Sequence, residues 1–231
     1  MRHWVLGESS INSVVWISIH GEKQIATLNM VKGVDVYGEK LVNYQGEEYR
    51  LWNPFRSKLA AALQHGLTSL PVKNGSKVLY MGASTGTTVS HLSDIVGLQG
   101  IIFAVEASSR VGRELVENLA FKRENILPIL ADARKPRSYF SVFGTVDVVY
   151  CDIAQPDQTE IAIENCLVYL RPGGSLLLVV KARSINVLLN PRDVFAQEAK
   201  KLENKKFSIG QLIKLEPFDK DHALFHATFK P

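Results

Sequence analysis

The sequence predicts an α/β fold, with a seven-stranded and mostly parallel sheet whose last strand runs antiparallel, preceded by a small antiparallel β module. Nearly all-apolar runs alternate with amphipathic helical segments from about residue 77 to residue 203, a pattern typical of a parallel sheet covered on both faces. Two β-rich runs near the end of the chain are joined by "DKD", too short a connection for a crossover helix, so the last strand should be antiparallel. The opening of the chain instead combines β-rich runs with turn glycines.

The N-terminal module is predicted to cover residues 1–52. In "SVVWISIHGEKQIATLNMV" two β-rich runs are divided by His20-Gly21-Glu22, a hairpin signal, and "VDVYGEKLVNYQGEEYRLW" continues with short strands. The pattern becomes helical in "NPFRSKLAAALQHG", where we expect Asn53 as N-cap, Pro54 at the first helical position and Gly66 as the stop. The main domain is therefore expected over residues 53–231.

The main domain alternates strands and helices. We expect strands near 77–81, 101–106, 126–131, 146–151 and 174–181, and helices near 88–96, 109–122, 157–169 and 191–203. Because these strands are almost entirely apolar, both faces of the sheet should be buried.

The composition indicates an ordinary globular protein. Its 231 residues are 46% hydrophobic, and 27 Lys and Arg against 23 Asp and Glu give a net charge of +4, too mild to indicate a nucleic-acid partner. No apolar run approaches the ~20 residues of a membrane span, and the N-terminus lacks the apolar core of a signal peptide, so we expect a cytoplasmic protein without a membrane partner. Cys151 and Cys166 have no further ligand at metal-binding spacing, and we interpret them as reduced core residues rather than a metal site.

A glycine loop follows the first predicted parallel strand in "LYMGASTGTTVSH". A dinucleotide site would need G-x-G-x-x-G, whereas Ser84 stands between Gly82 and Gly86 where the middle glycine would be required. This spacing argues against NAD and favours S-adenosylmethionine, whose amino-acid part contains no phosphate. With seven strands and a terminal antiparallel pair, the chain resembles the Rossmann-like methyltransferase fold.

Acidic residues end the next two strands. Glu106 closes "IIFAVE" about twenty residues beyond the loop, where a carboxylate can accept hydrogen bonds from both ribose hydroxyls of an adenosine. Asp132, followed by Ala133, closes the next strand and is placed to meet the adenine rim. Because open α/β sheets bind ligands at the carboxyl edge of their strands, these residues predict one cofactor site.

Four ionisable residues are expected at the same edge. Asp152 and Lys181 end the fourth and fifth parallel strands, and in the strand order 3-2-1-4-5-7-6 they lie on neighbouring strands about 5 Å apart and should pair. His222 begins the antiparallel last strand beside Lys181. Lys58, on the helix after Asn53, can point inward over the sheet edge.

Such a set could activate a poor oxygen nucleophile such as a ribose 2′-hydroxyl. Methyl transfer from a sulfonium is an in-line displacement that requires alignment and stabilisation of negative charge on the attacking oxygen. Lys181 is our candidate base, held by Asp152, because a second lysine and the sulfonium favour its neutral form. Lys58 and His222 would orient the hydroxyl and stabilise the oxyanion, and a neutral His222 is the alternative base.

Long segments of the chain resemble archaeal fibrillarin, in order and over nearly the whole chain from about residue 50. They are "WNPFRSKLAAAL", "MGASTGTTVSHLSDIVG", "RVGRELVENLAFKRENILPILADARKP", "DVVYCDIAQPDQTEIA", "GGSLLLVVKARSI" and "KDHALFH". The resemblance implies a methyltransferase that modifies ribose 2′-oxygens of ribosomal and transfer RNA within box C/D guide ribonucleoproteins. It also implies that the family's Lys-Asp-Lys-His set falls on Lys58, Asp152, Lys181 and His222.

The resemblance further implies the cofactor contacts and the partners. With the glycine loop, the expected cofactor-binding set is Gly82, Ala83, Gly86, Thr87, Thr88, Glu106, Ala107, Asp132, Ala133, Asp152 and Gln155. Ala107 departs from the family, which commonly has an adenine-stacking aromatic residue there. The implied partners are a Nop-domain scaffold protein, a kink-turn-binding ribosomal-type protein, a box C/D guide RNA and the target RNA, in the cytoplasm of an archaeal cell.

Three alternatives stay open. A dinucleotide-dependent oxidoreductase is disfavoured by Ser84, and a catalytically silent assembly subunit is disfavoured by the intact four-residue set. An unguided methyltransferase acting on RNA or on a protein side chain is less favoured, because the basic residues are scattered and no aromatic platform for single-stranded RNA is evident.

Overall fold

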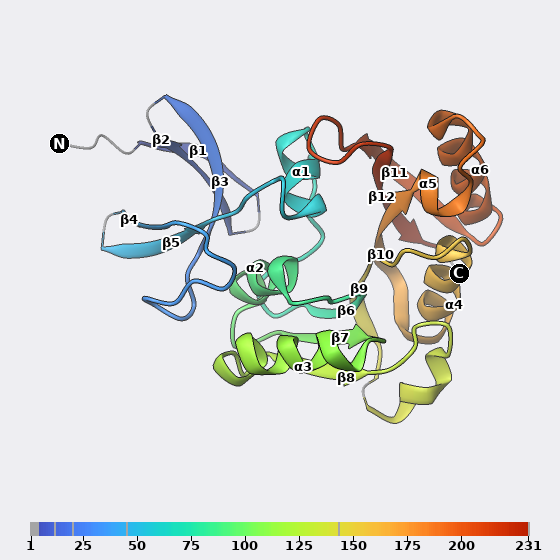
Figure 1. Ribbon diagram of the computed structural model, residues 1–231, viewed down its shortest axis with the longest axis horizontal. Coiled ribbons are helices and arrows are strands. Elements are labelled where there is room, and N and C mark those ends of the chain that lie inside the picture. The colour runs from blue at the N-terminus through green and yellow to red at the C-terminus, as the bar shows by residue number, and fades with distance from the viewer. Residues whose placement is uncertain (1–4, 12, 20, 45, 143, 231) are drawn as a thin grey trace.

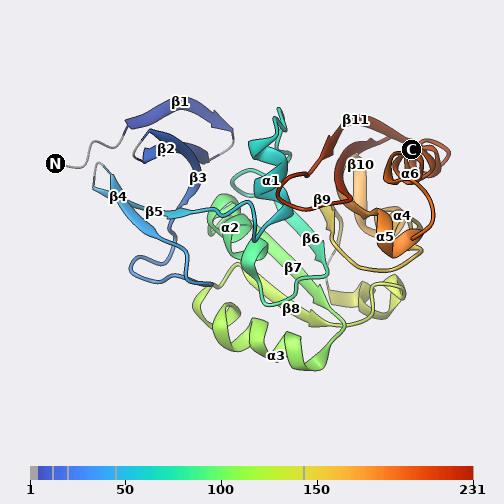
Figure 2. The same ribbon diagram turned by 45° about the horizontal axis from the view of Figure 1, so that its top comes forward.

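The computed structural model describes residues 5–11, 13–19, 21–44, 46–142 and 144–230. Two sheets organise the molecule, with the N-terminal sheet at one end, α1 and α2 in the middle and α4 and α6 at the other end in both ribbon views (Figures 1 and 2). Within the described residues no helix is long and apolar enough to cross a membrane.

The N-terminal sheet is antiparallel, in the order β1-β2-β3-β5-β4. Its strands are β1 (Val5–Ile11), β2 (Val14–Ile19), β3 (Glu22–Leu28), β4 (Leu41–Tyr44) and β5 (Glu47–Leu51). The predicted hairpin joins β2 to β3, where Ile19 pairs with Glu22, although His20 of the predicted turn lies outside the described residues.

The second sheet has seven strands in the order β11-β12-β10-β9-β6-β7-β8. Its strands are β6 (Lys77–Met81), β7 (Ile101–Glu106), β8 (Ile126–Leu130), β9 (Val146–Cys151), β10 (Leu170–Lys181), β11 (Phe207–Lys214) and β12 (His222–Phe229). Numbered along this domain, the order is the predicted 3-2-1-4-5-7-6, and β12 is antiparallel to both of its neighbours. The predicted fold class is therefore confirmed.

Helices cover both faces of this sheet. They are α1 (Lys58–Gln64), α2 (Thr87–Val96), α3 (Ser109–Asn118), α4 (Gln158–Tyr169), α5 (Ala182–Ile185) and α6 (Pro191–Glu203), with 3-10 turns at Ala120–Lys122 and Pro136–Val142. One core contains apolar residues of α1 and α2 together with Val78 and Tyr80 of β6, and the other contains residues of α4 and α6 together with Leu79 and Met81. Alternate residues of one apolar strand thus enter opposite cores, which explains why β6 shows no polar face.

The start of the first helix differs from the prediction. α1 begins at Lys58, and its N-cap is Ser57, whose hydroxyl accepts a hydrogen bond from the backbone of Ala60. Asn53 instead caps a separate turn, because its side chain accepts from the amide of Phe55 at 2.8 Å. Both residues are good caps, and the sequence contains no local signal that ranks one above the other.

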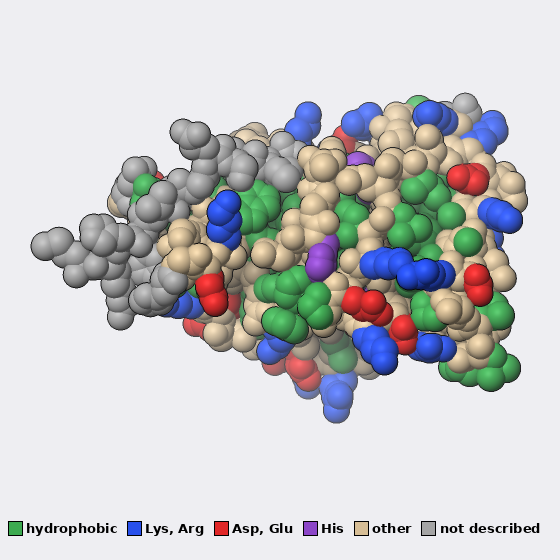
Figure 3. All heavy atoms as spheres, turned by 90° about the horizontal axis from the view of Figure 1, so that it is seen from above, with side chains coloured by type: hydrophobic (Ala, Val, Ile, Leu, Met, Phe, Trp, Pro, Cys, Tyr) green, Lys and Arg blue, Asp and Glu red, His purple; other side chains and the backbone are tan. Residues whose placement is uncertain are grey.

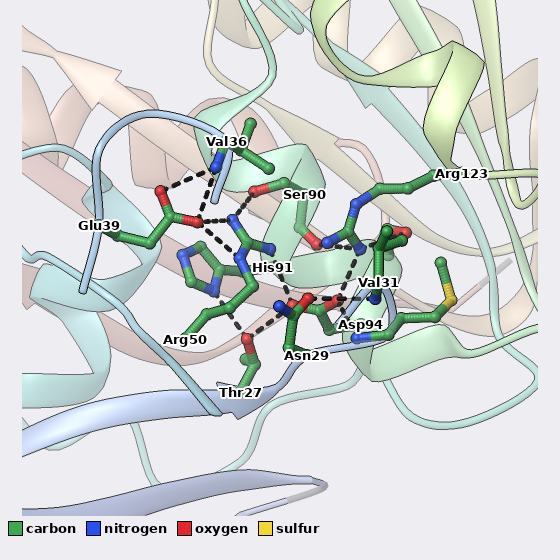
Figure 4. A network of polar contacts seen from close by, with 12 residues as sticks. Thr27, Asn29, Val31, Val36, Glu39, Arg50, Ser90, His91, Asp94 and Arg123 are labelled. Atoms are coloured by element: carbon green, nitrogen blue, oxygen red, sulfur yellow. Dashed lines mark hydrogen bonds and ion pairs between the residues drawn. The ribbon is translucent and has the colours of Figure 1, made fainter. Parts of the chain in front are cut away.

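A buried polar network joins the N-terminal sheet to α2 and to Arg123, which follows the 3-10 turn at Ala120–Lys122 (Figure 4). Arg50 of β5 bonds to Glu39, to Ser90 and, at 2.8 Å, to Asp94, and its side chain is fully buried. Asp94 also pairs with Arg123 at 2.6 Å. Each buried charge of this network therefore contacts a charge of opposite sign, which offsets the cost of removing it from water.

His91 lies in the same interface. Its ring stacks on Trp52 with centroids 4.6 Å apart, Nδ1 is 2.8 Å from the hydroxyl of Thr27, and Nε2 is 2.8 Å from that of Tyr37. Burial, followed by the charges of Arg50 and Arg123, holds the pKa of His91 well below its usual value, so the ring is neutral. Because Thr27 donates its proton to Asp94, Nδ1 of His91 carries the ring proton and Nε2 accepts from Tyr37.

Candidate active site

The glycine loop after β6 is held against the ends of β7 and β9. The amides of Gly82 and Ala83 both donate to the carbonyl of Val105, at 3.0 and 3.1 Å. Gly82 has φ +79°, and a Cβ there would lie 2.6 Å from the backbone oxygen of Asp152. The position therefore requires glycine both for its backbone conformation and for the close approach of two strand ends.

Most of the predicted cofactor residues line one cavity of about 290 Å³ at this edge. The lining includes Gly82, Glu106, Ala107, Asp132, Ala133, Asp152 and Gln155, together with Lys181. Ser84, Ile153 and Arg134 line it as well and were not predicted. The volume is near the low end of the range of roughly 300–1,000 Å³ typical of small-molecule sites.

Four predicted residues do not line the cavity, namely Ala83, Gly86, Thr87 and Thr88. Gly86 has φ +97°, and a Cβ there would collide with the side chain of Leu119. Thr88 is buried, with its hydroxyl 2.9 Å from that of Ser57. Thr88 thus connects the start of α2 to the cap of α1, the helix that carries Lys58.

Glu106 and Asp132 are both held in place by local contacts. The carboxylate of Glu106 accepts from the amides of Ser84 and Ser108, each at 2.9 Å, which leaves lone pairs on both oxygens for ribose hydroxyls. The carboxylate of Asp132 is bound by Arg134, with the shortest contact at 2.7 Å. Hydrogen bonds from Arg134 lower the pKa of Asp132, which therefore stays ionised.

Asp152 lies between the two predicted lysines. Nζ of Lys181 is 2.8 Å from Oδ1 of Asp152, and Nζ of Lys58 is 3.1 Å from Oδ2. Lys181 also donates to the backbone oxygen of Asp152 at 3.2 Å, while the backbone amide of Asp152 donates to the carbonyl of Met81 at 3.0 Å. The predicted pairing across β9 and β10 is present, and Lys58 reaches it from α1.

His222 is the cross-strand partner of Lys181, as predicted, but its ring bonds elsewhere. Nδ1 of His222 lies 2.9 Å from Oδ1 of Asp219 and 2.6 Å from the carbonyl of Lys220. Oδ2 of Asp219 is also 3.7 Å from Nζ of Lys58. Sequence reasoning missed Asp219, although its spacing three residues before His222 in a short loop was a usable signal.

Both cysteines are free and buried, in agreement with their interpretation as reduced core residues. A larger groove of about 560 Å³ lies between the N-terminal sheet and α1, and none of the predicted site residues lines it. The cavity at the ends of β6, β7 and β9 is therefore the candidate active site. It is smaller than the groove, but ionisable residues and part of the glycine loop line it.

Comparison with known proteins agrees with this geometry. The fibrillarin family model matches residues 7–231. The fibrillarin-like rRNA/tRNA 2′-O-methyltransferase of Saccharolobus islandicus is 53% identical over 210 residues, covering 91% of this chain and 90% of the relative.

Two solved structures are also similar. Aeropyrum pernix fibrillarin, crystallised with natively bound S-adenosyl-L-methionine, has a TM-score of 0.90 and 45% identity and covers 98% of this chain and 100% of its own. A fibrillarin in complex with Nop5p has a TM-score of 0.85 and 38% identity, and the match covers 97% of this chain and 100% of that fibrillarin. The sequence and the arrangement of strands agree along almost the entire length, and the chain belongs to the fibrillarin family.

Proposed function

We propose that this chain is an S-adenosylmethionine-dependent methyltransferase acting on ribose 2′-oxygens of rRNA and tRNA. The observation that carries the proposal is the carboxylate of Asp152, which two lysine ammonium groups share at 2.8 and 3.1 Å on the rim of the candidate cofactor cavity. The activity named for the Saccharolobus islandicus relative and the S-adenosyl-L-methionine bound in the Aeropyrum pernix structure support it.

The cavity fits an adenosine-containing cofactor. Glu106 would hold the ribose, Asp132 and Ala133 would border the adenine, and Gln155 would contact the cofactor from the loop after β9. Gly82, which has no Cβ, leaves room for the backbone of the loop beside Asp152. When bound, S-adenosylmethionine supplies a methyl group activated by a positively charged sulfur. Ala107 provides no aromatic face for the adenine.

The three charged side chains have distinct roles in this proposal. Both ammonium groups contact the carboxylate of Asp152, which holds them at the same edge of the cavity. In this proposal Lys181 acts as the base that takes the proton of the 2′-hydroxyl, while Asp152 keeps its Nζ in position. Lys58 stays charged and stabilises the negative charge that grows on the attacking oxygen. His222 remains the alternative base.

We further propose that the chain works within a box C/D guide ribonucleoprotein. A Nop-domain scaffold, a kink-turn-binding protein and a guide RNA would then place the target ribose, and the fibrillarin–Nop5p complex supports the first of these partners.

On the face drawn in Figure 3, Lys and Arg side chains are interspersed with Asp and Glu rather than gathered in one basic patch. Arg123, one of the scattered basic residues, is buried against Asp94 and is not available to RNA. Sequence choice by base pairing requires only limited RNA contacts from the enzyme itself.

We also propose that the N-terminal module, residues 1–52, and the main domain, residues 53–231, have different functions. The predicted site residues, from Lys58 to His222, belong to the part over 53–231, whereas residues 1–52 contribute the N-terminal sheet. The N-terminal module would then act as a support for α2 through Arg50 and Asp94 rather than as part of the catalytic edge.

Transfer of labelled methyl to a guide-matched RNA tests the proposed function. The chain alone, the chain with scaffold, kink-turn protein and guide, and the same assembly with a 2′-deoxy target nucleotide are compared. We expect label only in the complete assembly and none on the 2′-deoxy target. If the assembly forms but transfers no methyl, the chain is a silent subunit, and label from the chain alone would instead indicate an unguided enzyme.

A further inference from the structure

We propose that Asp219 is a positioning residue of the active site, which holds the imidazole of His222 and the ammonium of Lys58 in one continuous chain of contacts with Asp152 and Lys181. The effect of Asp219 on methyl transfer rests on the proposed function, whereas the positioning of His222 and Lys58 by Asp219 rests on the observed contacts alone. Neither the sequence motifs nor the comparisons assign a role to Asp219.

The contacts form a single path from the loop before β12, through α1, to the ends of β9 and β10. Asp219, in the loop between β11 and β12, contacts His222 at 2.9 Å and Lys58 at 3.7 Å. Lys58 continues the path to Asp152 at 3.1 Å, and Asp152 to Lys181 at 2.8 Å. Acidic and basic groups alternate along it, so displacement of any one carboxylate changes the position of the cations on both sides.

The surroundings of His222 determine which ring nitrogen carries a proton. Nδ1 lies 2.9 Å from a carboxylate oxygen of Asp219 and 2.6 Å from the carbonyl of Lys220, and both of these groups only accept hydrogen bonds. Nδ1 must therefore be the protonated nitrogen. A neutral His222 then has its lone pair on Nε2, which is the nitrogen able to accept a proton or a hydroxyl hydrogen bond.

Asp219 is ionised in this arrangement. Burial raises the pKa of its carboxyl, but the hydrogen bond from His222 and the charges of Lys58 and Lys181 outweigh that effect and lower the pKa. The carboxylate therefore contributes a full negative charge beside Lys58. It offsets part of the positive charge that the two lysines bring to the site.

The loop that carries Asp219 is anchored on both sides. The amides of Phe218 and Asp219 bond to the carbonyl of Leu215, at 2.9 and 3.0 Å, and Leu215 is fully buried. The ring of Phe218 packs edge-on against Phe55, which precedes α1, with centroids 5.0 Å apart. The amide of Leu215 in turn donates to the carbonyl of His222 at 3.0 Å, so these contacts fix the loop relative to β12 and to the segment that leads into α1.

A neighbouring carboxylate provides a matched control. Asp221 follows two residues later in the same loop, but its Oδ2 lies 3.0 Å from Nε of Arg183, and its side chain does not enter the path described above. Asp221→Asn removes the same charge from the same loop. It should therefore reproduce any general effect of the loop charge without the positioning effect.

Methyl transfer under single-turnover conditions is the first test, in the complete assembly with a guide-matched RNA. We expect Asp219→Ala to slow transfer by about 10- to 100-fold, as removal of supporting contacts does in other sites, with cofactor affinity unchanged. Asp219→Glu should recover part of the rate, and Asp221→Asn should stay within about twofold of the unsubstituted chain. An Asp219→Ala rate equal to that of Asp221→Asn would overturn the proposal. Equal urea midpoints for the two variants exclude unfolding as the cause.

Nitrogen NMR on the free chain is the second test, and it does not depend on activity. With ¹⁵N-histidine labelling, His222→Gln identifies the His222 signals among the six histidines. We expect Nδ1 to be protonated in the unsubstituted chain and the fraction of this tautomer to fall in Asp219→Ala but not in Asp221→Asn. An unchanged tautomer in Asp219→Ala would refute the positioning role. If the unsubstituted assembly transfers no methyl, the proposed function fails, while this spectrum still decides what Asp219 does.

Discussion

Arg50 donates to the carboxylate of Asp94 at 2.8 Å with both side chains fully buried, and this contact joins the N-terminal sheet to α2. Arg50→Met would leave the charges of Asp94 and Glu39 without this partner. We expect the free energy of unfolding to fall by about 3–5 kcal/mol in urea titrations. Arg113→Met, which removes an exposed pair with Glu117, should cost less than about 0.5 kcal/mol. Equal losses in the two variants would contradict the role of the buried network.

Gly82→Ala tests the close approach of β6 to β9. The added Cβ would lie 2.6 Å from the backbone oxygen of Asp152, so the chain must shift at the site itself. We expect cofactor affinity, measured by titration calorimetry, to fall at least about tenfold. Gly66→Ala is the matched control, because Gly66 has φ +90° but a Cβ there would meet no described atom within 4 Å, and the substitution should cost only backbone strain of about 1 kcal/mol. The same affinity in both variants would refute a steric requirement at Gly82.

Glu106→Gln tests the proposed ribose contact. The substitution keeps the size of the side chain but replaces one acceptor oxygen by an amide group, which cannot accept the hydrogen bonds now made by Ser84 or Ser108. We expect cofactor binding to weaken by about 10- to 100-fold, as hydrogen bonds to a charged group are worth about 1.5–3 kcal/mol. Glu124→Gln, on the exposed surface, should bind normally. Binding by Glu106→Gln within twofold of the control would argue against this contact.

The two cysteines provide a pH-dependent prediction. Burial raises the pKa of Cys151 to about 12 and that of Cys166 well above its usual value, so both thiols keep their protons at pH 7 to 9 and are also inaccessible. We expect no alkylation by iodoacetamide in the folded protein over this range and two modifications per chain in urea, measured by mass spectrometry. Modification of the folded chain that increases from pH 7 to 9 would show that one thiol is exposed and ionises normally.

Much of the fold follows from local patterns. The almost entirely apolar strand at 77–81 predicted burial on both faces, and strand ends combined with strand order were sufficient to place Asp152 beside Lys181. Choices between equivalent local signals were not predictable, because Asn53 and Ser57 are both good helix caps. Contacts over long sequence distances left no local trace either. Arg50 and Asp94 are 44 residues apart, and only the packing of the N-terminal sheet against α2 brings their charges together.

The candidate site shows the same limit. The glycine loop and the acids at strand ends have a recognisable spacing, so Gly82, Glu106 and Asp132 could be assigned to one cavity. Thr88 is adjacent to that loop in sequence, yet its hydroxyl faces Ser57, because the first turn of α2 points this side chain toward α1. Asp219 lies in a loop whose course depends on the packing of Phe218 and Leu215, which the sequence alone does not specify.

The most direct measurement of the central claim is the single-turnover rate of methyl transfer by the complete assembly carrying Lys181→Ala, with Lys200→Ala on the exposed surface of α6 as control. Loss of a positioned base should lower the rate by about 100- to 10,000-fold, while the affinity for S-adenosylmethionine changes little and the control matches the unsubstituted chain. Transfer by Lys181→Ala at the rate of the control would contradict the assignment of Lys181 as the base.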